Sequence, residues 1–260
     1  MKFSVTVGAV GEGRDPRGLA ELGRVVEDAG WDALFLEDYL VYQGDVSRPT
    51  YDPWICLAAI ATATERIRIG TTVTPLPRRR PWQVAAECMA LDHLSGGRMI
   101  LGVGIGDPGD PFMPGTEPRV LAEMLDEGLE LIDRLWTGQP VSVAGKHYRV
   151  DGVQLTARPV QRPRVPIWVG GNFLVPAVRR RIVRWDGSCA YKGTTAVPQQ
   201  TTPQDVRDLL AEGRPGFEVK VSGGDPGAFA EAGAAWWGRW IPPLPVAETV
   251  AIVRQGPPTI

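Results

Sequence analysis

The sequence predicts a (β/α)8 barrel that forms a single domain over residues 1–260. Eight apolar runs with the character of buried strands recur along the chain, and helical segments separate most of them. The first four runs begin near residues 3, 33, 67 and 98. One unit therefore takes about 30 residues, the length of a strand with its following helix. An open doubly wound sheet is the alternative fold.

Strands and helices alternate regularly in the first half of the chain. The predicted strands are apolar runs that end in glycine or in polar residues: Phe3–Gly8, Ala33–Asp38, Ile67–Val73 and Arg98–Gly104. The predicted helices begin at proline: Pro16, Pro53 and Pro81. Because the strand runs are continuous rather than alternating, we expect a parallel sheet whose outer face is covered by helices.

A longer excursion interrupts this period before the second half resumes it. A helix over Arg119–Trp136 and a hairpin around Ala144–Gly145 predict a helix-plus-hairpin insertion between strands four and five. The remaining predicted strands are Val165–Gly171, Asp186–Lys192, Phe217–Gly224 and Ala235–Pro242. The remaining predicted helices are Ala177–Trp185, Asp205–Glu212 and Val246–Arg254. No helix is predicted between strands seven and eight.

Composition limits the classes of partner. The 28 basic and 30 acidic side chains nearly cancel, so we expect no nucleic-acid partner. The three cysteines, Cys56, Cys88 and Cys189, lie far apart and form no paired zinc motif, which indicates reduced thiols in the cytoplasm. The opening MKFSVTVGAV does not resemble a signal peptide, and no apolar run approaches about 18 residues. We therefore expect a soluble protein without a membrane partner.

In such a barrel the active site lies at the carboxyl ends of the strands. The candidate residues at these ends are Gly8, Glu37, Asp38, Tyr39, Thr71, Thr72, Val73, Gly104, Gly106, Asp107, Gly170, Gly171 and Asn172. The carboxylates among them can act as acids or as hydrogen-bond acceptors. The two histidines, His93 and His147, lie away from the strand ends, so we expect neither a metal site nor a serine–histidine–aspartate triad.

Two glycine-rich strand ends have alternative interpretations. Free N–H groups of Gly170, Gly171 and Asn172 could hold a phosphate, or the glycines could serve only a sharp turn. Glycines within residues 102–106 could leave space for a flat ring, or they could mark a cramped corner. The basic cluster at residues 78–80 follows strand three and belongs to the rim of the mouth. We expect at least two of these arginines to face water.

A lysine at the end of strand six raises a competing function. Lys192 would suit a Schiff-base lyase of the aldolase type, in which a lysine amine condenses with a carbonyl substrate. A lysine in this position more often faces solvent. The lyase therefore stays an alternative to the function that follows.

The stretch TTVTPLPRRRPWQVAAECMALDHLSGGRMILGVGIGDPGD, with PIWVGG and WDG further on, resembles the bacterial luciferase-like flavin-dependent oxidoreductases. The resemblance implies FMN or the deazaflavin coenzyme F-420 in the barrel mouth, a small organic substrate and, as is common in the family, a homodimer. It implies a non-prolyl cis peptide within Thr71, Thr72 and Val73. It also places the cofactor phosphate at Gly170, Gly171 and Asn172, and a proton donor at Asp107.

One position departs from this family. Many relatives have an aspartate–histidine pair at the end of strand two, whereas this chain has Asp38 and Tyr39. A tyrosine has an unperturbed pKa near 10, so it donates a hydrogen bond but is a poor proton shuttle at neutral pH. We predict Asp107, Tyr39 and Asp38 as catalytic residues and the other strand-end residues as cofactor contacts. A non-catalytic flavin-binding barrel is a further alternative.

Overall fold

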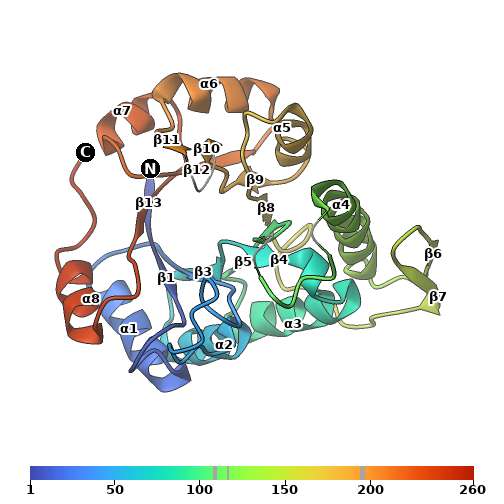
Figure 1. Cartoon of the computed structure of the whole chain (residues 1–260), viewed down its shortest axis with the longest axis horizontal. Helices are drawn as coiled ribbons and strands as arrows, with labels where there is room; N and C mark the ends of the chain where they lie inside the picture. The colour runs from blue at the N-terminus through green and yellow to red at the C-terminus, as the bar shows by residue number, and fades with distance from the viewer. Residues whose placement is uncertain (108–109, 116, 194–196) are drawn as a thin grey trace.

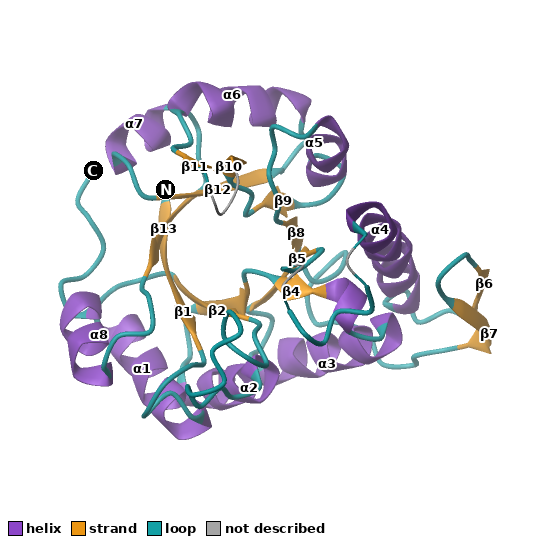
Figure 2. Ribbon diagram, viewed as in Figure 1, coloured by secondary structure: helices purple, strands orange, loops and turns teal. Residues whose placement is uncertain are grey.

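The computed structural model describes residues 1–107, 110–115, 117–193 and 197–260. Eight parallel strand positions surround one axis, and eight α-helices among these residues cover the outside (Figure 2). Hydrogen-bonded neighbours run in the order β3-β2-β1-β13-β12-β9-β8-β5-β4, and an additional pairing of β3 with β5 closes the ring. This closure confirms the barrel and excludes the open sheet.

Each barrel strand is followed by its helix along the chain (Figure 1). The barrel strands are β1 (Lys2–Gly8), β2 (Ala33–Glu37), β3 (Arg68–Thr71) continued by β4 (Thr74–Pro75), β5 (Met99–Gly104), β8 (Ile167–Val169), β9 (Gly187–Ser188), β12 (Glu218–Ser222) and β13 (Trp236–Trp240). The helices are α1 (Pro16–Asp28), α2 (Pro53–Ala63), α3 (Pro81–Leu94), α4 (Pro118–Leu135), α5 (Pro176–Ile182), α6 (Pro203–Glu212), α7 (Pro226–Glu231) and α8 (Val246–Val253). Shorter elements are the 3-10 turn η1 (Leu76–Arg78), β6 (Val141–Ala144), β7 (Arg149–Val153), β10 (Lys192–Gly193) and β11 (Pro198–Gln199).

Proline begins the first seven helices, which explains part of the high proline content. Proline suits the first turn because its fixed φ is helical and its missing N–H would have no partner there. Side chains of Asp15, Asp52, Thr202 and Asp225 accept hydrogen bonds from backbone N–H groups of the first turn. These caps place the start of each helix directly after a loop at the carboxyl side of the barrel.

Aromatic side chains fill part of the barrel interior. Phe35, Trp168 and Trp236 pack against one another with ring centroids 5.5 to 6.2 Å apart. Together with Ala33 and Ile100 they form a cluster separate from the larger core between strands and helices. The open space therefore lies above this plug, at the carboxyl ends of the strands. Trp236 is buried, whereas Trp240 is about half exposed.

Three details differ from the sequence expectations. The predicted long helix is α4, which occupies the position of the fourth barrel helix, so the excursion beyond the barrel is the hairpin of β6 and β7 (Figure 1). Strand six is short: β9 ends at Ser188, only an isolated bridge joins Tyr191 to Asn172, and β10 pairs with β11 in a separate sheet. The six-residue α7 was not predicted, since such a short helix shows no clear apolar period. No helix in the described ranges is long and apolar enough to span a membrane.

Candidate active site

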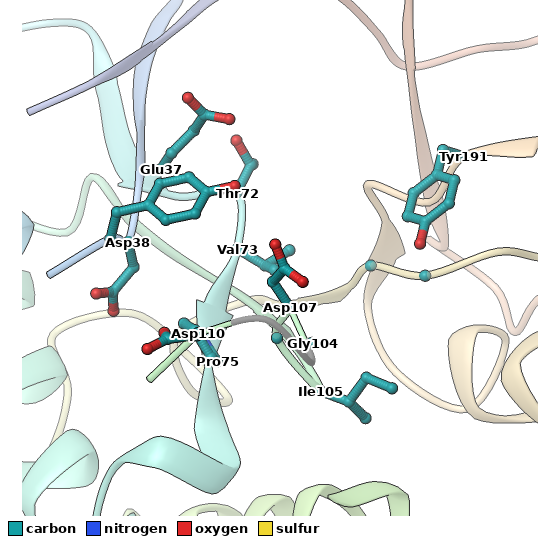
Figure 3. A pocket seen from close by; sticks show the side chains of 14 residues that line it. Glu37, Asp38, Thr72, Val73, Pro75, Gly104, Ile105, Asp107, Asp110 and Tyr191 are labelled. Atoms are coloured by element: carbon teal, nitrogen blue, oxygen red, sulfur yellow. The ribbon is translucent and has the colours of Figure 1, made fainter. Parts of the chain in front are cut away.

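The third barrel strand is interrupted at the mouth. β3 ends at Thr71 and β4 starts at Thr74, and the peptide bond between Thr72 and Val73 is cis. A non-prolyl cis peptide was expected at this position. The Thr71 hydroxyl donates to the carbonyl of Gly102 at 2.8 Å, and the Thr74 hydroxyl donates to Thr71 Oγ1 at 3.0 Å. These bonds satisfy the buried hydroxyls of Thr71 and Thr74, and the interruption presents Thr72 and Val73 to the pocket (Figure 3).

Glycines of two neighbouring strands make room for Val73. A Cβ atom on Gly104 would lie 2.9 Å from Val73 Cγ2, and one on Gly170 would lie 2.7 Å from Val73 Cγ1. A Cβ on Gly102 would lie 2.0 Å from the carbonyl oxygen of Thr71. Such distances exclude a larger side chain without displacement. Gly102 and Gly104 therefore allow close packing, as the cramped-corner interpretation expects, while Gly104 and Gly106 also line the pocket.

The pocket is built from the carboxyl ends of β2, β4, β5, β8 and β9 (Figure 3). It has a volume of about 240 Å³ and is lined by Glu37, Asp38, Tyr39, Thr72, Val73, Pro75, Gly104, Ile105, Gly106, Asp107, Asp110, Gly170, Gly171 and Tyr191. Ten of these residues were predicted from the sequence. The other four are Pro75 in β4 and three residues in the loops after β5 and β9: Ile105, Asp110 and Tyr191. Ile105 and Tyr191 lie at the ends of predicted strands but were not among the predicted site residues.

Three predicted site residues do not line the pocket. The carbonyl of Gly8 accepts a hydrogen bond from Arg14 Nη1 at 3.4 Å, and Thr71 is fully buried. Asn172 Oδ1 accepts from the N–H groups of Leu174 at 3.1 Å and Gly193 at 3.2 Å, so it holds two loops together. These three residues lie behind the pocket lining and support the residues that form it.

The glycine pair after β8 forms a turn. Gly171 has φ of +139°, a conformation that favours glycine, and its carbonyl accepts from the N–H of Tyr191 at 3.0 Å. The N–H of Gly170 donates to the carbonyl of Val103 at 2.8 Å, so the expectation of a free N–H at this residue is wrong. The physical reason is that Gly170 still pairs with the neighbouring strand. A phosphate site would depend on the residues after it.

Asp38 is held by two of the arginines from the basic cluster. Arg79 donates from Nε and Nη2 to its two oxygens at 3.0 Å each, and Arg78 donates to its Oδ1 and its carbonyl oxygen. The indole of Trp54 donates to Oδ2 at 3.2 Å. Arg78 also pairs with Asp110. The Asp38 carboxylate thus joins the ends of strands two and three, and Arg78 extends the network to the loop after β5.

This network overturns the expected solvation of the arginines. The side chains of Arg78 and Arg79 are only 3% and 15% exposed, and Asp38 is 0% exposed. Arg80 alone of the three is exposed, and its guanidinium lies over the ring of Trp82 at 5.9 Å. The acids that neutralise the other two come from separate loops, so local sequence could not reveal the pairing. The position of the cluster beside the pocket rim was predicted correctly.

Glu37 and Thr72 each present one buried oxygen atom that has no hydrogen-bond partner among the described atoms. Burial raises the pKa of the Glu37 carboxyl group, although a hydrogen bond from Trp240 opposes the shift. Glu37 Oε2 and Thr72 Oγ1 are both buried and make no hydrogen bond among the described atoms. Figure 3 shows both residues on one side of the pocket and Tyr191 on the other. A buried polar atom without a partner is costly, so these atoms are suited to a ligand.

Tyr39 and Asp107 complete the polar wall. Burial, followed by the nearby Glu37 charge, raises the pKa of Tyr39 to about 12. Tyr39 therefore keeps its proton at physiological pH and acts as a hydrogen-bond donor. Its ring packs edge-on against Tyr42 with centroids 5.0 Å apart. Asp107 is exposed at the mouth, where its carboxylate is accessible to solvent.

The lysine behind the alternative lyase function lies elsewhere. Lys192 Nζ donates to both carboxylate oxygens of Asp205, at 3.1 and 2.9 Å, and does not line the pocket. Asp205 in turn completes the capping box of α6 with Thr202. An ion-paired ammonium is a poor nucleophile, so the structure gives the lyase no support. Among the described residues there is no cluster of three or more potential metal ligands.

A closed barrel with an acidic and aromatic pocket at its carboxyl end is the architecture of a small-molecule enzyme. The family model for luciferase-like monooxygenases matches residues 1–224. The chain belongs to this family.

Individual relatives include both F-420 enzymes and a monooxygenase. The F420-dependent glucose-6-phosphate dehydrogenase of Nakamurella multipartita is 34% identical over 163 residues, which is 60% of this chain and 47% of that protein. The 4-hydroxyprotoasukamycin monooxygenase of Streptomyces nodosus subsp. asukaensis is 34% identical over 152 residues, which is 57% of this chain and 40% of that protein. The chain thus spans about half the length of the curated relatives it matches.

Solved structures show the same fold over almost the whole chain. An F420-dependent secondary alcohol dehydrogenase superposes with a TM-score of 0.78 at 16% identity and covers 99% of this chain and 98% of its own. The monooxygenase RslO1 from Streptomyces bottropensis superposes with a TM-score of 0.75 at 20% identity, covering 98% and 97%. At such identities the likeness establishes the barrel alone.

Proposed function

We propose that this protein is an oxidoreductase that binds coenzyme F-420 in the pocket at the barrel mouth and acts on a small organic molecule, with FMN as the competing cofactor. The observation that carries the proposal is the pair of unpartnered buried atoms, Glu37 Oε2 and Thr72 Oγ1, in the wall of that pocket. The family supports a flavin-type cofactor. Two curated relatives at 34% identity are F420-dependent dehydrogenases, and this similarity supports our choice of F-420 over FMN.

The residues present suit a planar polar ring. Val73, backed by Gly104 and Gly170, supplies an apolar wall, and Thr72 and Glu37 supply hydrogen-bonding groups for ring heteroatoms. A deazaflavin or flavin bound there supplies hydride transfer or, for FMN, oxygen chemistry. We assign to the protein the tasks of binding the ring, excluding water from it and managing protons.

Three side chains of the pocket wall hold or transfer protons. Glu37 has a raised pKa, so it exchanges a proton closer to neutral pH than an ordinary carboxyl group does. Tyr39 holds its proton and orients an oxygen by donating a hydrogen bond. Asp107 is exposed and passes a proton between the pocket and solvent. Asp38, whose carboxylate is fully committed to arginines, acts as a positioning residue.

Cofactor titration tests the proposal. Purified protein is titrated with F-420 and with FMN, each followed by its own fluorescence. We expect F-420 to bind in the micromolar range and FMN more weakly. The substitution Thr72→Val keeps the shape but removes the hydroxyl, so it should weaken binding about five-fold, equivalent to about 1 kcal/mol. The exposed Thr62, whose hydroxyl bonds its own helix, provides the control Thr62→Val with unchanged binding.

The outcome also decides between the candidates. If neither cofactor binds below about millimolar concentration, the proposal fails. Tighter binding of FMN, with oxygen consumption by its reduced form, would assign the chain to the monooxygenases of the family. Binding without turnover under any reductant would indicate the non-catalytic barrel.

A homodimer, a cytoplasmic location and the lack of a nucleic-acid partner remain our predictions. The three cysteines are free, and Cys56 and Cys88 are buried, which supports a reducing compartment. Sedimentation at several protein concentrations measures the oligomeric state directly.

A further inference from the structure

Two barrel strands, β1 and β12, present polar side chains to the barrel interior on either side of β13 (Figure 2). The valines of these two strands, at positions 5, 7, 219 and 221, belong to the core between strands and helices. Successive side chains of a strand point to opposite faces. The residues next to these valines therefore face the barrel axis: Ser4, Thr6, Lys220 and Ser222.

The amine of Lys220 lies at the floor of the barrel mouth. Lys220 is 7% exposed, whereas Ser222, two positions further toward the carboxyl end of the same strand, is exposed. Lys220 Nζ lies 3.4 Å from Ser222 Oγ and 5.8 Å from the ring centroid of Phe35 in the aromatic plug. The amine therefore lies where the plug ends and the solvent-accessible mouth begins.

The neighbouring strands leave room and a free hydroxyl beside this amine. A Cβ atom on Gly238 of β13 would lie 2.7 Å from Lys220 Nζ and 3.1 Å from Ser4 Oγ, so a larger residue would displace the amine. Thr6 lies two residues further toward the mouth than Ser4 and pairs in register with the half-exposed Trp240. Thr6 Oγ1 is buried and has no hydrogen-bond partner within the described part of the chain. Such a hydroxyl is suited to a ligand oxygen.

No carboxylate neutralises Lys220 in the part of the chain that the structure describes. Its one hydrogen-bond acceptor there is Ser222 Oγ. Glu218, the preceding inward residue of β12, instead pairs with Lys2 at 3.7 Å and accepts from the indole of Trp236 at 3.2 Å. The acid on the same strand is therefore held at the opposite end of the barrel, away from the mouth.

The other titratable groups on this side of the barrel do not hold a proton on Lys220. Burial raises the pKa of Cys189, just beyond β9, to about 11, so this residue is an uncharged thiol at pH 7. Glu37, at the end of β2, accepts a hydrogen bond from Trp240. Burial lowers the pKa of Lys220 from its ordinary value of 10.5, which increases the share of neutral amine.

Lys220 also differs from the remaining lysines of the chain. The chain has four lysines, and the other three form ion pairs: Lys2 with Glu218, Lys146 with Glu123 and Lys192 with Asp205. An ion pair holds the proton on an ammonium group and removes its lone pair from reaction. A desolvated lysine without an acid partner is the form that attacks carbonyl carbon atoms in proteins.

We propose that Lys220 captures small uncharged aldehydes or ketones that enter the barrel mouth, by forming an imine with them. The lone pair of Nζ attacks the carbonyl carbon, and the two hydrogens of the neutral amine leave with the carbonyl oxygen as water. A C=N bond replaces the C=O bond, and no oxidant or reductant takes part. The hydroxyl groups of Ser222 and Thr6 are placed to hydrogen-bond the departing oxygen.

This inference goes beyond the proposed function and does not rest on it. It also differs from the lyase alternative, which placed the reactive amine at Lys192 and required cleavage of a substrate. The inference concerns capture of the carbonyl compound alone.

Reductive trapping tests the inference. The protein without added cofactor is incubated with acetaldehyde and sodium cyanoborohydride, which reduces an imine to a stable secondary amine. Peptide mass spectrometry then gives the labelling rate of each lysine. At pH 7 we expect Lys220 to be labelled at least about ten-fold faster than Lys2 and Lys146, because an exposed lysine with a pKa near 10.4 is almost entirely protonated. The side chains of these two reference lysines are 53% and 69% exposed.

The pH dependence and two variants sharpen the test. The ratio of the rates should fall as the pH rises toward 10, because the exposed lysines then lose their protons as well. Lys220→Arg should abolish this label, since a guanidinium stays protonated. Lys192→Arg is the matched control and should keep the label on Lys220. Because the four lysines are also compared within the original chain, the result does not depend on the folding of a variant.

Three results would overturn the inference. Labelling of Lys220 at pH 7 that is no faster than that of Lys2 and Lys146 is the first. Labelling that requires unfolding in urea is the second, and a ratio that rises with pH is the third. Failure of the cofactor titration refutes the proposed function and leaves this inference standing, because the trapping is measured on the protein alone.

Discussion

Arg79 donates two hydrogen bonds to Asp38, from Nε and Nη2 to the two carboxylate oxygens, at 3.0 Å each. The two residues lie 41 positions apart in the chain and close together at the rim of the mouth. This bidentate pair fixes the end of β2 against the turn after β4, and Arg78 carries the same connection to Asp110. One network of buried ion pairs therefore holds together the segments after β2, β4 and β5 that line the pocket.

Breaking this support should destabilise the fold. Arg79→Met removes one partner of a buried pair, and we expect the free energy of unfolding to fall by about 3 kcal/mol because the remaining carboxylate loses a desolvated partner. Urea unfolding followed by circular dichroism measures it. The exposed pair of Arg184 and Glu130 provides the control: the side chains are 59% and 53% exposed, and Arg184→Met should cost less than about 1 kcal/mol. Equal losses in the two variants would contradict a buried support.

Replacing the buried acid should change the pH dependence of stability. Burial raises the pKa of Glu37, so the folded state favours its protonated form, and stability is lost as pH rises from the ordinary value of 4.5 through the raised pKa. Glu37→Gln removes this loss. We expect a higher melting temperature than the original chain at pH 7.5 and a smaller difference at pH 4. A difference that stays constant across this range would show that Glu37 ionises normally.

The tyrosine just after β2 should add no pH dependence of its own to cofactor binding. Because the pKa of Tyr39 is raised to about 12, its hydroxyl stays protonated between pH 6 and 9. Tyr39→Phe should weaken cofactor binding without changing the shape of its pH profile. Tyr39→His introduces the histidine that the family resemblance leads us to expect here and should add an inflection near pH 6.5. Fluorescence titrations at a series of pH values distinguish the two, and an inflection in the original chain that Tyr39→Phe abolishes would refute the assignment.

Val73 and Gly170 should be energetically coupled. Gly170→Ala places a Cβ 2.7 Å from Val73 Cγ1 and should cost about 1 to 3 kcal/mol through overpacking. Val73→Ala in the same chain removes the clash, so the double variant should regain most of the loss of Gly170→Ala. Gly115→Ala is a suitable control because nothing lies within 4 Å of its Cβ position. Additive losses in this double-mutant cycle would show that the glycine serves another purpose.

The barrel could be predicted from the periodic apolar runs and from the glycines and prolines that mark the ends of strands and the starts of helices. A buried strand or helix face requires a local pattern of apolar residues in the sequence. Each βα unit repeats this pattern, which gives the period of the barrel. The same reasoning located ten residues of the pocket wall, because the carboxyl ends of parallel strands meet at one mouth. The cis peptide between Thr72 and Val73 was predicted from the resemblance to the family, because residue patterns do not reveal such a bond.

The tertiary structure alone decided how the charges and the glycines are used. The sequence suggested that Arg78 and Arg79 face water, yet acids from two other loops pair with them: Asp38 and Asp52 between β2 and α2, and Asp110 after β5. Gly104 and Gly170 make room for Val73 of the interrupted third strand, a packing that the sequence does not reveal. The physical reason is common to both. Electrostatic partners and close packing depend on residues that are distant in the chain, whereas sequence patterns report only the burial of each segment by itself.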